Sequence, residues 1–168
     1  MTVERFSPQH ALWPAYLAHL ERVDMARWVI GEDGLPLEGL HFLGAVEKNR
    51  VIGNISLKLQ DIVSPATDWS GGRETTIVGL DGQPLRETFV CTFAVEKSFR
   101  RRGHGRALQL AALALTRALG AYQMRSWSSL DKPANYALKI SLGFAIHPAT
   151  QQSMNGYPVS GVYFIKTV

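Results

Sequence analysis

Apolar residues along the chain are grouped in short runs that predict strands. The run at 40–59 is interrupted by Glu47-Lys48-Asn49-Arg50, which predicts a hairpin of two strands. Residues 61–73 are rich in Pro, Gly, Ser and Asp and predict a surface loop. Further strands are predicted at 74–80, 86–95, 123–130, 144–149 and 161–168.

Other segments show the spacing of helices. Leu12, Tyr16 and Leu20 form an apolar stripe after Ser7-Pro8, and Pro14 predicts that the regular helix begins near Trp13. Short and longer helices are predicted at 24–30, 106–119 and 133–144, with Gly120 ending the second of these. Within 106–119 a narrow polar stripe predicts a helix that lies with its other faces against a sheet. The members of this stripe are Arg106, Gln109, Thr116 and Arg117.

This order of elements predicts a mixed α/β domain of the α+β type, with a mixed central sheet flanked by helices. The 168 residues contain 46% apolar and 19% charged residues, which is an ordinary balance for a globular chain. A chain of this length can bury a core without metals or disulfides, so we expect one domain over residues 1–168.

The composition also excludes several classes of protein. Cys91 is the lone cysteine, so no intramolecular disulfide can form, and this fits a reducing cytoplasm. The first twenty residues lack the apolar region of a signal peptide, and no apolar run reaches about 18 residues. We therefore expect a cytoplasmic protein that does not bind a membrane. No Cys, His and Asp cluster has the spacing of metal ligands, so no metal is expected.

The stretch "FAVEKSFRRRGHGRAL" at 93–108 joins a strand end to three arginines, Gly-His-Gly and a helix. A helix N-terminus stabilises an anion, and arginine suits phosphate oxygens. The stretch therefore predicts a phosphate-bearing ligand, against the alternative of a solvated basic helix start. A P-loop would need Gly-Lys-Ser/Thr, and a dinucleotide fingerprint would need glycine in place of Leu108.

These residues resemble the acetyl-CoA-binding signature of the GNAT superfamily of N-acetyltransferases. In that signature a strand ending in Val is followed by an arch with Arg-x-x-Gly-x-Gly, matched here by Val95, Arg100, Gly103 and Gly105. The block "KPANYALKISLGF" at 132–144 resembles the family's C-terminal helix, which ends in Leu-Gly-Phe. With the hairpin at 44–57, the resemblance covers roughly residues 40–168.

The resemblance implies acetyl-CoA as co-substrate. Its pantetheine arm would pair with the strand before the arch, and its pyrophosphate would sit on the arch backbone between Arg101 and Arg106. The His104 side chain is expected to turn to solvent or to a neighbouring helix. The implied CoA-binding residues are Phe93, Ala94, Val95, Arg100, Arg101, Arg102, Gly103, His104, Gly105, Arg106 and Asn135.

The resemblance also implies two catalytic candidates. Family members often carry a Glu on the signature strand as base; here Phe89 stands nearest that position, and Glu87 is the carboxylate on the same predicted face. That face would hold Glu87, Phe89, Cys91, Phe93 and Val95, with Glu96 on the other face. The family's acid is often a Tyr where this chain has Lys139, so Tyr136, one turn earlier, is the candidate acid.

The function implied is transfer of an acetyl group to a primary amine of a small molecule or peptide, by direct attack rather than through Cys91. The alternative is an acyl-CoA-binding sensor or regulatory protein without transferase activity. A nucleic-acid-binding module using the arginines ranks last, because no aromatic platform lies near them. The resemblance also allows for a homodimer. The acceptor contacts are expected from the N-terminal helices, 61–73 and 151–158, with Trp13, Tyr16, Trp28 and Trp69 as candidates.

Overall fold

A computed structural model describes residues 1–64, 74–153 and 155–168. Its centre is a mixed seven-stranded sheet in the order β1-β2-β3-β6-β7-β9-β8. All neighbouring strands are antiparallel except β6 and β7, which are parallel. The strands are β1 (Thr2–Phe6), β2 (Leu40–Glu47), β3 (Arg50–Asp61), β6 (Arg86–Val95), β7 (Gln123–Ser129), β8 (Ala145–Gln152) and β9 (Pro158–Thr167).

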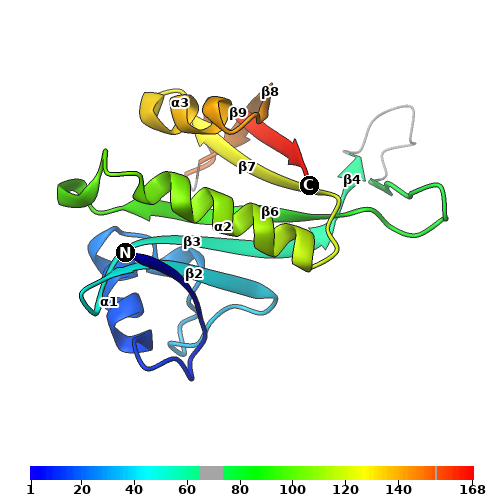
Figure 1. The fold of residues 1–168 in the computed structure, drawn as a ribbon. Coiled ribbons are helices and arrows are strands. Elements are labelled where there is room, and N and C mark those ends of the chain that lie inside the picture. Colours follow the sequence, from blue (N-terminus) through cyan, green and yellow to red (C-terminus); the bar gives the residue numbers. More distant parts are fainter. Residues whose placement is uncertain (65–73, 154) are drawn as a thin grey trace.

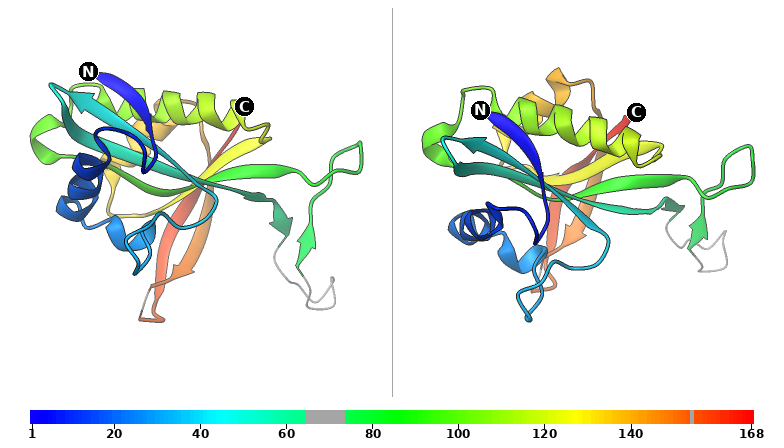
Figure 2. Two further views of the ribbon diagram at one scale, coloured as in Figure 1. Left: turned by 90° about the horizontal axis from the view of Figure 1, so that it is seen from below. Right: turned by 60° about the horizontal axis from the view of Figure 1, so that its bottom comes forward.

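Helices cover both faces of this sheet and enclose two apolar clusters (Figure 1, Figure 2). Helix α1 (Trp13–Arg22) closes a cluster over β1, β2 and β3, where Tyr16 and Leu20 are fully buried. Helices α2 (His104–Ala118) and α3 (Pro133–Ser141) contribute to the cluster on the other face. The mixed sheet between helices is the α+β fold that the sequence predicted.

Several expected elements are confirmed and others differ. The hairpin turns at 47–50, where Lys48 and Asn49 both have positive φ, and α1 begins at Trp13. The predicted helix at 24–30 is only the 3-10 turn η1 (Ala26–Trp28). Strand β1 was missed because its five residues carry only two apolar side chains, Val3 and Phe6.

The strand expected at 74–80 is also wrong in extent. Only β5 (Thr75–Thr76) is regular, and it pairs with β4 (Val63–Ser64) in a separate two-stranded sheet. Figure 2 shows this pair on an arm that projects from the body of the molecule. Most of the predicted loop at 61–73 lies outside the described residues.

The polar stripe predicted for α2 is also corrected by the structure. Gln109 and Thr116 are fully buried, whereas Leu110 of the same helix is half exposed. Thr116 can be buried because its hydroxyl bonds the Thr88 hydroxyl at 2.6 Å and the Ala112 carbonyl at 2.8 Å. Only Arg106 and Arg117 of the stripe lie on the exposed face of the helix.

Strand β6 departs from regular pairing on both of its sides. Against β3 the register shifts, so that Ser56 faces Thr92 while Leu57 faces Val90, and Cys91 is the extra residue of a β-bulge. Against β7 it pairs only over 87–89, with 123–125. From Val90 onward the two parallel strands therefore separate, and the edge of β6 facing β7 forms no ladder.

Candidate active site

A cleft of about 1500 Å³ opens where β6 and β7 separate. Its walls are residues 90–96 of β6 and its end, residues 126–129 of β7, and the first turn of α3. The lining also includes residues of the arch between β6 and α2, and residues at and after the end of α1 and in η1.

The arch is shaped to present backbone N–H groups. It contains the 3-10 turn η3 (Lys97–Phe99), and both Arg101 and Gly103 have positive φ, 63° and 84°. No side chain caps α2, and the first N–H bonded within the helix is that of Ala107, to the Gly103 carbonyl. The N–H groups of the first turn are therefore available to an anion at the positive end of the helix dipole.

Buried polar atoms along the cleft lack partners within the protein. The Ser126 hydroxyl, the Trp127 indole nitrogen and the Asn135 amide oxygen are buried and make no hydrogen bond to described residues. All three residues line the cleft. Because a buried polar atom without a partner is costly, their gathering here favours a ligand that supplies hydrogen bonds.

The structure brings most of the expected CoA-binding residues to the cleft. Arg100 is anchored by a 2.9 Å bond from its Nε to the Val95 carbonyl. The expected residues that line the cleft are Phe93, Ala94, Val95, Arg100, Arg101, Gly103, Gly105 and Asn135.

Three side chains expected at the ligand point elsewhere. Arg102 lies over the Phe99 ring, and Arg106 bonds the Ser141 hydroxyl at 3.3 Å. His104 is buried 3.9 Å from the Glu47 carboxylate, not turned to solvent, and does not line the cleft. For His104 and Arg106, only the backbone N–H groups remain suited to binding the CoA pyrophosphate, which is the role expected from the sequence.

Glu87, the expected base, lies at the far end of β6 from the arch and does not line the cleft. It is fully buried, and both of its oxygens accept hydrogen bonds. Gln60 and Gln123 each donate at 2.9 Å, and Arg125 donates from Nε at 2.9 and 3.0 Å. These bonds give Glu87 the setting of a structural ion pair.

The face assignment of β6 fails because of the bulge. Val90, Phe93 and Val95 pack with the cluster under α2, whereas Cys91 packs with the cluster under α1. A strict alternation cannot produce both, because Val90 and Phe93 are three residues apart. The inserted Cys91 also turns Glu96 toward α1 and into the wall of the cleft.

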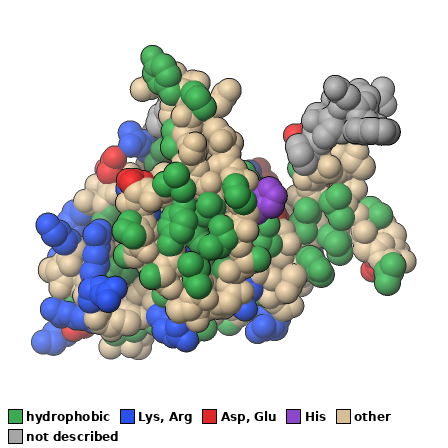
Figure 3. Space-filling model, turned by 90° about the horizontal axis from the view of Figure 1, so that it is seen from above, with side chains coloured by type: hydrophobic (Ala, Val, Ile, Leu, Met, Phe, Trp, Pro, Cys, Tyr) green, Lys and Arg blue, Asp and Glu red, His purple; other side chains and the backbone are tan. Residues whose placement is uncertain are grey.

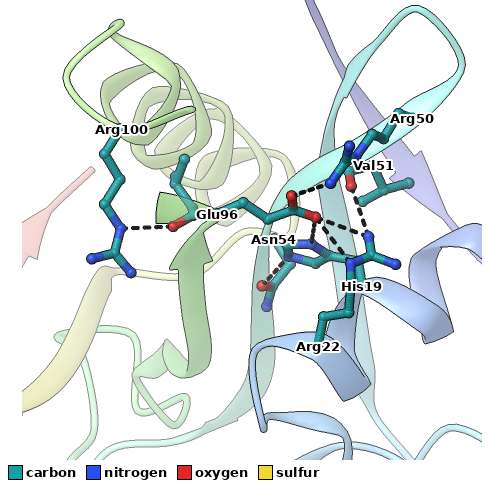
Figure 4. Close-up of polar contacts among 8 residues, drawn as sticks. His19, Arg22, Arg50, Val51, Asn54, Glu96 and Arg100 are labelled. Atoms are coloured by element: carbon teal, nitrogen blue, oxygen red, sulfur yellow. Dashed lines mark hydrogen bonds and ion pairs between the residues drawn. The ribbon is translucent and has the colours of Figure 1, made fainter. Parts of the chain in front are cut away.

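Glu96 is the centre of a charged network that fastens α1 to the sheet (Figure 4). Its carboxylate accepts from Arg22 at 2.9 Å, from His19 Nδ1 at 3.3 Å and from Arg50. The other His19 nitrogen bonds the Asn54 amide oxygen at 3.0 Å. Asn54 in turn donates to the Thr92 hydroxyl at 2.9 Å, so the network reaches the cleft at Thr92 as well.

These contacts set the charges of the network. Burial lowers the pKa of His19, whereas its bonds to Asn54 and Glu96 act to raise it. For Glu96, burial acts to raise the pKa, but the bonds from Arg22 and His19 and the charge of Arg50 outweigh it and lower the pKa. Glu96 therefore stays ionised and is poorly suited to accept a proton.

Tyr136, the expected acid, does not line the cleft. Its ring packs edge-on against Phe164 at 5.0 Å, and its hydroxyl donates to the Ser128 carbonyl at 3.4 Å. The α3 residues that do line the cleft are Pro133, Ala134, Asn135, Leu138 and Lys139. Lys139, the position that the sequence treated as a departure, is among them, but its Nζ is buried against Gln109 and the rings of Phe144 and Phe164.

Sequence reasoning named Trp28 as an acceptor candidate but missed Arg22 and Met25. Arg22, Met25 and Trp28 reach the cleft from α1, η1 and the loop between them. Among the aromatic acceptor candidates, Trp13 and Tyr16 are core residues, Trp28 is half exposed at the cleft, and Trp69 lies outside the described residues. A lysine within an apolar helix stripe was the one signal that could have pointed to Lys139.

Charge is distributed unevenly around this site. Residues 97–168 contain ten Lys or Arg and one Asp, whereas residues 1–96 contain eight Lys or Arg and thirteen Asp or Glu. Figure 3 shows Lys and Arg side chains gathered at the end of the molecule where the arch lies in Figure 1. The cleft thus opens into a basic surface that attracts anions.

Among residues 1–64, 74–153 and 155–168, no three His, Cys, Asp or Glu side chains are grouped as metal ligands would be. None of the helices in the described part of the chain combines the length and the apolar composition that a membrane crossing requires.

Comparison with known proteins gives a family match. Residues 6–144 match the model of the acetyltransferase (GNAT) family. No curated protein matches the chain.

Solved structures of low sequence identity share the fold. Arabidopsis thaliana NAA60 in complex with acetyl-CoA has a TM-score of 0.69 at 13% identity, covering 99% of this chain and 98% of that one. The ribosomal-protein-S18-alanine N-acetyltransferase from Escherichia coli has a TM-score of 0.64 at 16% identity, covering 99% and 93%. An aminoglycoside 6'-N-acetyltransferase complexed with coenzyme A has a TM-score of 0.64 at 16% identity, covering 99% and 97%.

Proposed function

The chain belongs to the GNAT acetyltransferase family, and we propose that it transfers an acetyl group from acetyl-CoA to a primary amine of a small molecule or peptide. The observation that carries this proposal is the separation of β6 from β7 beside the uncapped N-terminus of α2. Together they form one continuous cleft with a basic, anion-binding end and an open strand edge.

The residues of the cleft fit the parts of acetyl-CoA. First-turn N–H groups of α2 and the guanidinium groups of Arg100 and Arg101 suit a pyrophosphate. The unpaired edge of β6 from Val90 to Val95 suits the amides of the pantetheine arm, as an added strand would. An N–H on this edge would also stabilise negative charge on the thioester oxygen as the amine attacks.

Direct attack by the acceptor amine is favoured over an acetyl-cysteine intermediate. Cys91 lines the cleft, but burial raises the pKa of its thiol, which keeps it protonated. Its Sγ is directed to the Phe89 carbonyl at 3.7 Å, and no histidine among the described residues contacts it. Acetyl transfer to Cys91 would therefore lack an activating base.

The acceptor is expected at the end of the cleft lined by α1 and η1. Trp28 is 48% exposed there, beside Met25 and the stem of Arg22. Glu96 forms the adjoining wall, where its carboxylate is paired with Arg22 and Arg50. The relatives named for ribosomal-protein alanine and for aminoglycosides support an amine acceptor and leave its size open.

Calorimetric titration with acetyl-CoA, CoA and ATP tests the donor site. We expect micromolar binding of acetyl-CoA and CoA and much weaker binding of ATP, because only the CoA species have a pantetheine arm for the β6 edge. Failure of the folded protein to bind acetyl-CoA would contradict the proposal and favour the solvated or nucleic-acid-binding alternatives for the arginines.

A pair of substitutions at Gly105 locates the binding site. A Cβ at Gly105 would lie 3.4 Å from Phe93 and 3.5 Å from Leu138, which is ordinary contact, so both variants should fold. Gly105→Glu places a carboxylate beside the first-turn N–H groups, and we expect it to weaken acetyl-CoA binding at least a hundredfold. Gly105→Gln has the same size without the charge and should lose roughly tenfold less. Equal binding by Gly105→Glu and the unsubstituted protein would place the donor elsewhere.

Release of CoA thiol separates a transferase from an acyl-CoA sensor. Both bind acetyl-CoA, but only a transferase releases the thiol faster when an amine is added. Suitable probes are an alanine-starting peptide, an aminoglycoside and a polyamine, each followed by mass measurement of the acetylated product.

A further inference from the structure

Two tryptophans line the cleft, Trp28 from η1 and Trp127 from β7. Trp127 lies two residues beyond Arg125, which pairs with Phe89 and lies over its ring at 5.4 Å. Side chains alternate along a regular strand, so Trp127 points to the same side of the sheet as Phe89 and Cys91. This is the side that α1 and η1 cover, and the cleft therefore has two indole rings on its α1 side.

The ring of Trp127 is seated in a fixed place. A Cβ at Gly161 of β9 would meet the Ser128 carbonyl oxygen and would lie 2.6 and 2.8 Å from atoms of the Trp127 ring. A glycine at this position therefore leaves the room that the ring occupies. The indole N–H of Trp127 is buried and has no acceptor among the described residues. A fixed ring with an unpartnered donor favours a ligand that has both an apolar part and an oxygen acceptor.

The charges of the cleft are unsuited to a polycationic acceptor. Among the described residues, the lining contains two carboxylates, and each is paired with a cation. Glu96 is paired with Arg22 and Arg50, and Asp131 with Lys132. Further ammonium groups on an acceptor would thus meet an excess of positive charge. The six cationic residues of the lining are Arg22, Lys97, Arg100, Arg101, Lys132 and Lys139.

We propose that the acceptor is the α-amine of an aromatic or large apolar amino acid, either free or as the first residue of a peptide; this rests on the proposed function. Its side chain packs against Trp28 and Met25, and its carboxylate or carbonyl oxygen accepts a hydrogen bond from the Trp127 indole N–H. The α-nitrogen forms a bond to the acetyl carbon, and the carbon–sulfur bond breaks with its electron pair going to sulfur. The amine loses one proton and the thiolate takes up one, so the reaction is balanced.

A matched set of acceptors tests this substrate class. Three peptides differ only in the first residue, which is Phe, Ala or Lys, and free phenylalanine and a polyamine complete the set. We expect kcat/KM to be about tenfold higher for the Phe peptide than for the Ala peptide, because a phenyl ring buries more apolar surface. The Lys peptide and the polyamine should be poorer than the Ala peptide. The ratio between free phenylalanine and the Phe peptide identifies which form is used. A higher kcat/KM for the polyamine, or equal values for the Phe and Ala peptides, would overturn the proposal.

Substitution of Trp28 tests the apolar contact. Trp28→Ala should lower kcat/KM for the Phe peptide about tenfold, to near the value for the Ala peptide, and should leave acetyl-CoA affinity unchanged. Tyr122→Ala is the matched control, because Tyr122 is 51% exposed, close to the 48% of Trp28, and does not line the cleft. Equal selectivity for the Phe peptide in Trp28→Ala and Tyr122→Ala would overturn the role of Trp28.

Trp127→Phe tests the hydrogen bond, because it keeps a ring against Gly161 and removes the indole N–H. We expect about tenfold lower kcat/KM for the Phe peptide and little change for phenethylamine, which has the ring and the amine but no carbonyl. An equal loss with both acceptors would show that the N–H does not bind the acceptor oxygen.

Binding measured without turnover separates this proposal from the proposed function. Calorimetric titration of the Phe peptide into the complex with CoA should show binding that Trp28→Ala weakens. Failure of this complex to bind the Phe peptide would overturn the acceptor class and leave the donor site intact. Absence of acetyl-CoA binding by the unsubstituted protein would instead overturn the proposed function.

Discussion

Glu87 and Lys139 are two fully buried charges in opposite situations. Glu87 has a guanidinium and two amide donors, which satisfy its carboxylate. Lys139 has one amide oxygen and two ring faces. A buried charge is tolerated when it is paired, so Glu87 is explained by structure, whereas Lys139 is buried without a counter-charge.

The free-energy cost of burying the Lys139 ammonium predicts how the stability of the fold depends on pH. Its pKa falls from 10.5 in the unfolded chain to about 7 in the fold, so between these pH values the unfolded chain holds a proton that the folded chain lacks. The free energy of unfolding should therefore rise with pH across this range, by up to about 5 kcal/mol from this group. Lys139→Met removes this contribution.

Urea denaturation of the unsubstituted protein and Lys139→Met measures the effect at both ends of the range. Near pH 7 the Met variant should be the more stable of the two, and the difference should shrink as the pH rises. Lys166→Met, on the neighbouring β9, is the control and should leave the pH dependence unchanged. A constant difference between the protein and Lys139→Met would mean that the ammonium is not desolvated.

At the scale of elements, the bulge at Cys91 determines where the site lies. It changes which β6 side chains face α1 and which face α2, and it occurs where β6 leaves β7. Bulges bend a strand and increase its twist, which is consistent with the divergence of the two strands.

The bulge also explains which predictions from the sequence succeeded. Apolar runs identified β2, β3, β6, β7 and α2, and the arch was located because glycine and arginine act through local backbone geometry and charge. Strict alternation of side chains failed beyond Cys91, because the position of the extra residue depends on how β6 pairs with β3, and the paired residues Ser56 and Thr92 are 36 positions apart in the sequence. Lys139 and Met25 were missed as cleft residues, because tertiary packing alone brings them there.

Helix α1 should depend on Glu96 for its attachment. Glu96→Gln removes the charge that holds Arg22 and Arg50 and weakens the bond from His19, whose ring is fully buried. We expect a loss of roughly 1 to 3 kcal/mol in the free energy of unfolding and faster amide hydrogen exchange in α1. Because the pKa of Glu96 is lowered in the fold, its contribution is present above the ordinary carboxyl pKa and is lost as the pH falls below it.

The exposed pair of Asp24 and Arg27 provides the control for this variant. Both side chains are more than half exposed, so Asp24→Asn should cost less than about 1 kcal/mol and leave exchange in α1 unchanged. Equal effects of Glu96→Gln and Asp24→Asn would show that the network does not fasten the helix.

For the whole molecule, charge separation supplies long-range attraction for the donor. The net charge of +4 conceals a strongly basic segment after Glu96 and an acidic segment before it. The basic end attracts a ligand with several phosphate charges. Salt shortens the range of this attraction, because the Debye length is about 10 Å at 0.1 M ionic strength.

Salt should therefore weaken acetyl-CoA binding mainly by slowing association. Two substitutions should distinguish the direct contact of the ligand with the arch from the attraction of the net positive charge. Arg101→Gln removes a charge that lines the cleft, and we expect roughly tenfold weaker binding with a reduced dependence on salt. Arg117→Gln removes the same charge from the exposed far end of α2 and should slow association only slightly. Stopped-flow association and calorimetry over a series of salt concentrations measure both quantities. Equal losses in the two variants would mean that net charge, and not the arch, holds the donor.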